Sequence, residues 1–162
     1  MLRDWQSEIT PAILFCGGPE WPSKDRRAGS QGESRTASGK NAKIIVIDDE
    51  SLIAETVVEI LNEQGFEAVP VSSGASAIEL AKTVRPAIVL SDVIMPGLNG
   101  IETGIKIREI VPNCRVILFS GQAATVDLLE KAREQGHRFD ILAKPIKPEH
   151  LISIIRSSLP SQ

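Results

Sequence analysis

Aromatic side chains are scarce in this sequence of 162 residues, which contains four Phe, two Trp and no Tyr. Few rings are therefore present on which unpaired bases could stack, and single-stranded nucleic-acid binding is disfavoured. Residues 43–162 carry 12 basic and 16 acidic side chains. A mildly acidic region lacks the basic stripe that meets duplex phosphates. We therefore expect no direct binding to nucleic acid.

Cysteines and long apolar runs are also few. Two cysteines, Cys16 and Cys114, are too few for a disulfide framework, and two free thiols in a reducing compartment are the simpler interpretation. No segment reaches the ~18 apolar residues that span a bilayer. The apolar run at 12–16 is shorter than the hydrophobic part of a signal peptide, roughly 7–15 residues. We expect a cytoplasmic protein with no membrane association.

The first quarter of the chain has a different composition from the rest. Residues 17–39 include five Gly, two Pro and four Ser. Such a stretch buries too little apolar surface to offset its ordering entropy. We therefore predict a flexible N-terminal extension at 1–42 and a folded domain at 43–162.

Short apolar runs alternate with helical stripes five times from residue 43 onward. The runs lie at 43–47, 66–71, 87–90, 116–119 and 140–143, and they predict strands buried on both faces. Repeated strand–helix units indicate a parallel sheet covered by helices on both faces. About 120 residues are too few for an eight-fold barrel, which needs ~200 or more. An α/β fold with an open, doubly wound, five-stranded sheet is therefore predicted.

Polar side chains follow four of these predicted strands. Asp48 and Asp49 come after the first, Asp92 after the third, Ser120 after the fourth and Lys144 after the fifth. Each residue alone could be a cap, turn or solvated side chain. The carboxyl ends of parallel strands share one edge of the sheet, however, and ligands bind at that edge. We therefore expect these side chains to form one site.

This set of side chains indicates a particular chemistry. Three carboxylates repel one another unless a cation shares their site, and Mg²⁺ prefers such oxygen ligands. A lysine and a hydroxyl nearby could hold phosphoryl oxygens. The set therefore suggests transfer of a phosphoryl group to an aspartate, which forms an acyl phosphate.

The segments around these residues resemble the receiver domain of two-component response regulators. The matching motifs are VIDDE at 46–50, SDVIMPGLNG at 91–100, LFSG at 118–121 and AKP at 143–145. Each motif is weak evidence alone, but the four in this order and spacing are highly specific. The resemblance covers about 43–159 and implies a flavodoxin-like (βα)5 fold with strand order 2-1-3-4-5. It also implies a signalling domain rather than an enzyme.

The resemblance implies a role for each site residue. Asp92 is the expected phosphoacceptor, supplied by a phosphohistidine on a sensor histidine kinase or a histidine phosphotransfer protein. Ser120 and Lys144 are expected to contact the phosphoryl group, and a cis bond before Pro145 is plausible. The implied Mg²⁺ ligands are Asp48, Asp49, Asp92 and the backbone carbonyl of Ile94.

Two features depart from the family's pattern. Ile141 stands where the family usually has an aromatic residue that turns inward, and Phe139 is not at the matching position. Either Ser120 and its loop report the signal without a ring, or the outer face signals differently. Ile94 and Gln122 are expected to border the attacking water. Because Ile94 is apolar and cannot orient that water, we expect slow hydrolysis of the acyl phosphate.

We interpret the chain as a stand-alone receiver whose phosphorylation changes a face that binds an unknown downstream protein. A degenerate receiver that docks partners independently of phosphorylation is one alternative. A fragment of a larger regulator or hybrid kinase is another. A nucleotide-binding protein fits less well, because the acidic loop at 48–50 repels phosphate where a Gly-rich loop would cradle it.

Overall fold

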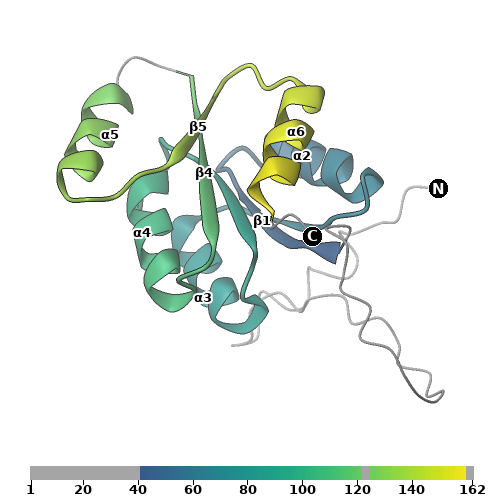
Figure 1. Ribbon diagram of the computed structural model, residues 1–162, viewed down its shortest axis with the longest axis horizontal. Helices are drawn as coiled ribbons and strands as arrows, with labels where there is room; N and C mark the ends of the chain where they lie inside the picture. Colours follow the sequence, from purple (N-terminus) through teal and green to yellow (C-terminus); the bar gives the residue numbers. More distant parts are fainter. Residues whose placement is uncertain (1–40, 122–124, 160–162) are drawn as a thin grey trace. The chain divides into compact units, whose positions relative to one another are not determined.

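The computed structural model describes residues 41–121 and 125–159, so nearly all of the predicted extension lies outside the described residues. Strands and helices alternate along the described chain (Figure 1). The strands are β1 (Lys43–Ile47), β2 (Glu67–Val71), β3 (Ile88–Asp92), β4 (Arg115–Ser120) and β5 (Asp140–Ala143). The helices are α2 (Ser51–Glu63), α3 (Gly74–Val84), α4 (Gly100–Ile110), α5 (Thr125–Glu134) and α6 (Pro148–Ser158).

The five strands form one parallel sheet in the order β2-β1-β3-β4-β5. Helices α2 and α6 cover one face, and α3, α4 and α5 cover the other (Figure 1). The predicted flavodoxin-like (βα)5 fold is therefore confirmed. Within 41–121 and 125–159, every helix is too short or too polar to cross a lipid bilayer.

Two strands extend further than their apolar runs predicted. Asp92 is the last residue of β3 and Ser120 the last residue of β4, whereas we expected both to follow their strands. Their backbones still pair in the sheet, Asp92 opposite Phe119 and Ser120 opposite Ala143. A polar side chain at the edge of a sheet reaches solvent without disturbing the strand, so hydropathy alone ends the strand too early.

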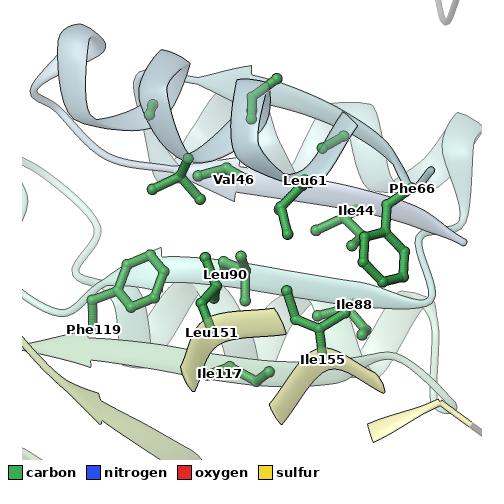
Figure 2. Close-up of a cluster of buried hydrophobic side chains, with 14 of the residues drawn as sticks. Ile44, Val46, Leu61, Phe66, Ile88, Leu90, Ile117, Phe119, Leu151 and Ile155 are labelled. Atoms are coloured by element: carbon green, nitrogen blue, oxygen red, sulfur yellow. The ribbon is translucent and has the colours of Figure 1, made fainter. Parts of the chain in front are cut away.

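One apolar core lies between the sheet and the helices α2 and α6 (Figure 2). Alternate residues of the strands point into it, as the two-residue period of a strand requires. Leu61 of α2 and Ile155 of α6 are fully buried there. The intervening residues, such as Ile45 and Val89, are equally buried and face the other helix layer. Burying such side chains stabilises the fold by about 1.5–3 kcal/mol each.

The first residue of helix α4, Gly100, packs against the backbone of Asp92. Its first turn is closed by a capping box, in which the Glu102 amide donates to the Asn99 side chain (2.8 Å) and the Asn99 amide donates to the Glu102 carboxylate (3.2 Å). The Gly100 amide donates to the Val93 carbonyl at 2.9 Å. These bonds hold the start of the helix against the end of β3 and so fix the backbone that carries Asp92.

Candidate functional site

The register of the sheet brings the predicted polar side chains to one edge. Ile47 pairs with Ser91, so the residues that come next along the chain, Asp48 and Asp92, adjoin each other. Ser120 pairs with Ala143 at the end of β5, and the next residue is Lys144. The backbone amide of Lys144 donates to the Ser120 carbonyl at 2.9 Å. Side chains far apart in the sequence therefore meet because the strands are parallel and end together.

Three carboxylates lie close together at this edge. Asp48, Asp49 and Asp92 each offer an oxygen within 4.8 Å of the others. Asp48 is buried, Asp92 is partly buried and Asp49 is exposed, so the cluster opens to solvent on one side. One Asp48 oxygen accepts a hydrogen bond from the Glu50 amide at 2.9 Å, which fixes the orientation of that carboxylate.

Lys144 bridges two of these carboxylates. Its Nζ lies 3.2 Å from an Asp92 oxygen and 3.5 Å from an Asp48 oxygen. Burial lowers the pKa of Lys144, but the charges of Asp92 and Asp48 raise it by more, so the net shift is upward. The amine is therefore charged at neutral pH and aimed at Asp92.

The donor set fits a hard divalent cation. The three carboxylates and Lys144 together carry a formal charge of −2, and the three clustered oxygens are all of the type that Mg²⁺ accepts. Mg²⁺ usually takes one or two carboxylates and keeps several waters, and the exposed side of the cluster leaves room for them. The same opening would admit phosphoryl oxygens.

The chain matches the response regulator receiver domain over residues 44–156. It belongs to that family. Members of the family are phosphoacceptor signalling modules of two-component systems rather than classical enzymes. The predicted resemblance is therefore confirmed, and it covers nearly all of the described residues.

The relatives of this receiver differ in size. The DNA-binding response regulator MtrA of Mycobacterium tuberculosis is 29% identical over 117 residues, which are 72% of this chain and 50% of MtrA. Sporulation initiation phosphotransferase F of Bacillus subtilis is 28% identical over 120 residues, which are 74% of this chain and 95% of that protein. A crystal structure of a receiver domain protein from Clostridium thermocellum has a TM-score of 0.65 and 30% identity, and covers 72% of this chain and 93% of that one. The receiver thus spans about half the length of its mycobacterial relatives.

One polar contact at the site was not anticipated from the sequence. The hydroxyl of Ser120 forms a hydrogen bond with the hydroxyl of Thr125, the first residue of α5. The apolar stripe that predicts this helix starts only at Leu128, so nothing in the pattern singled out Thr125. Thr125 is 2% exposed, and this burial is a property of the packing that the sequence pattern does not reveal.

The structure describes Ile141 and Ile94, which depart from the family's pattern, but not Gln122. Ile141 is 49% exposed on β5, so an apolar side chain lies in solvent there. Phe139 does not replace the missing aromatic, because its ring lies 4.6 Å from the Arg108 guanidinium and beside Gly104 on α4. Gln122 lies outside the described residues. Ile94 is exposed after β3, and its carbonyl as a metal ligand stays a prediction.

The predicted cis peptide bond is present between Lys144 and Pro145. It lies in the connection between β5 and α6. Pro148 then occupies the first turn of α6, where its missing amide donor costs nothing. The segment that carries Lys144 is therefore held between a strand and a helix start.

Proposed function

We propose that this receiver accepts a phosphoryl group on Asp92 from the phosphohistidine of a sensor histidine kinase or a histidine phosphotransfer protein. A carboxylate oxygen of Asp92 attacks phosphorus, and the bond from phosphorus to the histidine nitrogen breaks as the new oxygen–phosphorus bond forms. The product is an acyl phosphate on Asp92. The observation that carries this proposal is the grouping of the three carboxylates with Lys144 Nζ at 3.2 Å from Asp92.

Mg²⁺ is the cofactor that we propose for this reaction. Asp48, Asp49 and Asp92, with the backbone carbonyl of Ile94, would hold the ion. When bound, Mg²⁺ neutralises charge on the phosphoryl oxygens. Lys144 supplies a second positive charge beside the acceptor. In the phosphorylated protein its amine would exchange part of its contact with Asp92 for a contact with the phosphoryl oxygens.

The phosphodonor protein docks, in this proposal, on an apolar groove beside the acidic site. The groove has a volume of about 360 Å³ and lies between α2 and the segment from Lys144 to Leu151. Leu52 of α2 lines it and is 75% exposed, which is unusual for a large apolar side chain. Because Lys144 borders both the groove and Asp92, a protein seated there would hold its histidine over the acceptor.

The output is a change in a protein-binding face. We propose that the phosphorylated receiver binds a downstream protein and acts in the cytoplasm. Phosphorylation adds charge at the end of β3, and it shifts a two-state equilibrium of α5 and β5. If phosphorylation is not coupled to this face, the chain is instead a docking module that binds its partner independently of phosphorylation. The exposed Ile141, in place of an inward-turning ring, is the feature that favours this second candidate.

The test is intact mass spectrometry after incubation with acetyl phosphate and Mg²⁺. The parent protein is expected to gain one phosphoryl group, while Asp92→Asn and the parent in excess chelator gain none. Beryllofluoride binding in the presence of Mg²⁺ is measured in parallel, because rapid hydrolysis could empty the acceptor before analysis. A parent that neither gains mass nor binds beryllofluoride would contradict the proposal and favour the docking module.

A further inference from the structure

The Ser120 hydroxyl, which we expect to turn toward the phosphoryl group and so act as a switch, has a partner within its own fold. Ser120 Oγ, at the end of β4, and Thr125 Oγ1, at the start of α5, form a hydrogen bond. Among the described residues, no other hydrogen bond joins Ser120 Oγ to a neighbouring side chain, and none joins it to Asp92 or Lys144. Among the described side chains, Thr125 is therefore the hydrogen-bond partner of the Ser120 hydroxyl.

The backbone around Ser120 restricts how its hydroxyl can move. Ser120 is paired in the sheet opposite Ala143, and its carbonyl accepts a hydrogen bond from the Lys144 amide at 2.9 Å. Thr125 is 2% exposed at the first position of α5. With both backbones held by regular structure, the hydroxyl reaches a phosphoryl group on Asp92 mainly by turning about its own side-chain bond.

The two partners of Ser120 compete for one hydroxyl. The direction in which the Ser120 oxygen points selects its partner, whichever of the two hydroxyls donates the proton to the other. When Ser120 turns toward the acidic site, its contact with Thr125 is lost. The free energy of that contact is therefore subtracted from the affinity of the switch for the phosphoryl group.

We propose that Thr125 is a positioning residue that holds Ser120 in the unphosphorylated conformation and so weakens the phosphorylated state. The inference rests on the proposed function, since it concerns the same hydroxyl switch. A net hydrogen bond in a protein is worth about 0.5–1.5 kcal/mol, so its removal changes an equilibrium by about two- to ten-fold. Thr125 therefore sets the balance between the two states of the receiver.

The experiment compares beryllofluoride affinity at saturating Mg²⁺ among variants of the full chain. Thr125→Val removes the hydroxyl while it keeps the branched shape, and about two- to ten-fold tighter binding is expected. Thr125→Ser keeps a hydroxyl and is expected to restore the parent affinity. Thr125→Ala is a second variant without the hydroxyl, in case valine disturbs folding, and thermal unfolding checks each protein.

A double-mutant cycle isolates the contact itself. In a Ser120→Ala background, Thr125→Val is expected to leave the affinity unchanged, because the partner hydroxyl is already absent. Unchanged or weaker binding by Thr125→Val in the parent background would overturn the inference, as would an equal effect in both backgrounds. A parent that binds no beryllofluoride and gains no phosphoryl group would instead overturn the proposed function, and this inference with it.

Discussion

Replacing Gly100 with alanine would introduce a methyl group between α4 and the residue that we propose as phosphoacceptor. A Cβ at Gly100 would lie 2.0 Å from the Asp92 carbonyl oxygen and 2.9 Å from the Ser91 hydroxyl. Ordinary contact begins at about 3.4 Å, so either the start of α4 or the end of β3 must move by about 1.4 Å. The obstacle is backbone, which cannot rotate away as a flexible side chain can.

The clash and the helix propensity act in opposite directions here. Alanine in place of glycine favours a helix by up to about 1 kcal/mol. Overpacking against fixed atoms costs about 1–3 kcal/mol, and the very short distance to the Asp92 carbonyl oxygen places this site at the upper end. We therefore expect Gly100→Ala to lower the free energy of unfolding by about 2 kcal/mol. For a domain of this size that corresponds to a fall in Tm of about 8 °C.

Thermal unfolding followed by circular dichroism measures the loss of stability, and Mg²⁺ titration by calorimetry measures the effect of a displaced Asp92 on metal binding. Gly136→Ala is the matched control, because Gly136 has a φ of +86° and no atom within 4 Å of the added Cβ. It is expected to lose about 1 kcal/mol through backbone strain while its Mg²⁺ affinity stays at the parent value. Gly100→Ala is expected to lose both stability and Mg²⁺ affinity, since Asp92 is displaced. A Gly100→Ala protein at least as stable as the parent would refute this reasoning.

Three further predictions concern single side chains. Ile94→Asn is expected to speed hydrolysis of the phosphorylated protein several-fold, because an amide can orient the attacking water, and an unchanged half-life would count against that role. Leu52→Glu is expected to slow phosphotransfer from a protein donor about ten-fold while labelling by acetyl phosphate is unaffected, and equal losses with both donors would argue against the groove. Burial raises the pKa of Cys114 from 9.0 to about 12. In a Cys16→Ser background, alkylation of Cys114 at pH 8 is therefore expected to be about 1000-fold slower than alkylation of a free thiol. Rapid labelling of the folded protein would contradict this prediction. The buried thiol stabilises the fold fully below pH 9, and that contribution is lost as the pH rises toward 12, where the thiol of the unfolded chain has already lost its proton.

The parallel five-stranded sheet and the residues of the acidic cluster were predictable from the sequence for a physical reason, whereas the strand order was implied only by the family resemblance. A strand buried on both faces must be apolar throughout, so the first polar residue after each run marks the edge of the sheet. Asp48 was located in this way, Asp92 follows Ser91, which is the first polar residue after the third run, and the parallel register brings the two carboxylates together. Their grouping depends only on strand direction and order, which a short chain of alternating units leaves few ways to arrange.

The contacts of Thr125 and Gly100 depend on distances between elements, which cannot be derived from the hydrophobic pattern of the sequence. Thr125 precedes the apolar stripe of its helix, and its contact with Ser120 depends on where the start of α5 lies beside the end of β4. Gly100 followed a loop rich in turn residues, where a glycine is unremarkable. Its close approach to the Asp92 carbonyl becomes visible only when α4 is placed against β3. Both contacts are set by packing between layers rather than by local sequence.

Locating the phosphoryl group on the polypeptide tests the central claim most directly. After reaction with acetyl phosphate and Mg²⁺, borohydride reduces an aspartyl phosphate to homoserine, which tandem mass spectrometry assigns to one residue. We predict homoserine at position 92 alone, with Asp48 and Asp49 unmodified. Homoserine at position 48 or 49, or a phosphoryl group that Asp92→Asn retains, would contradict the assignment of Asp92 as the phosphoacceptor.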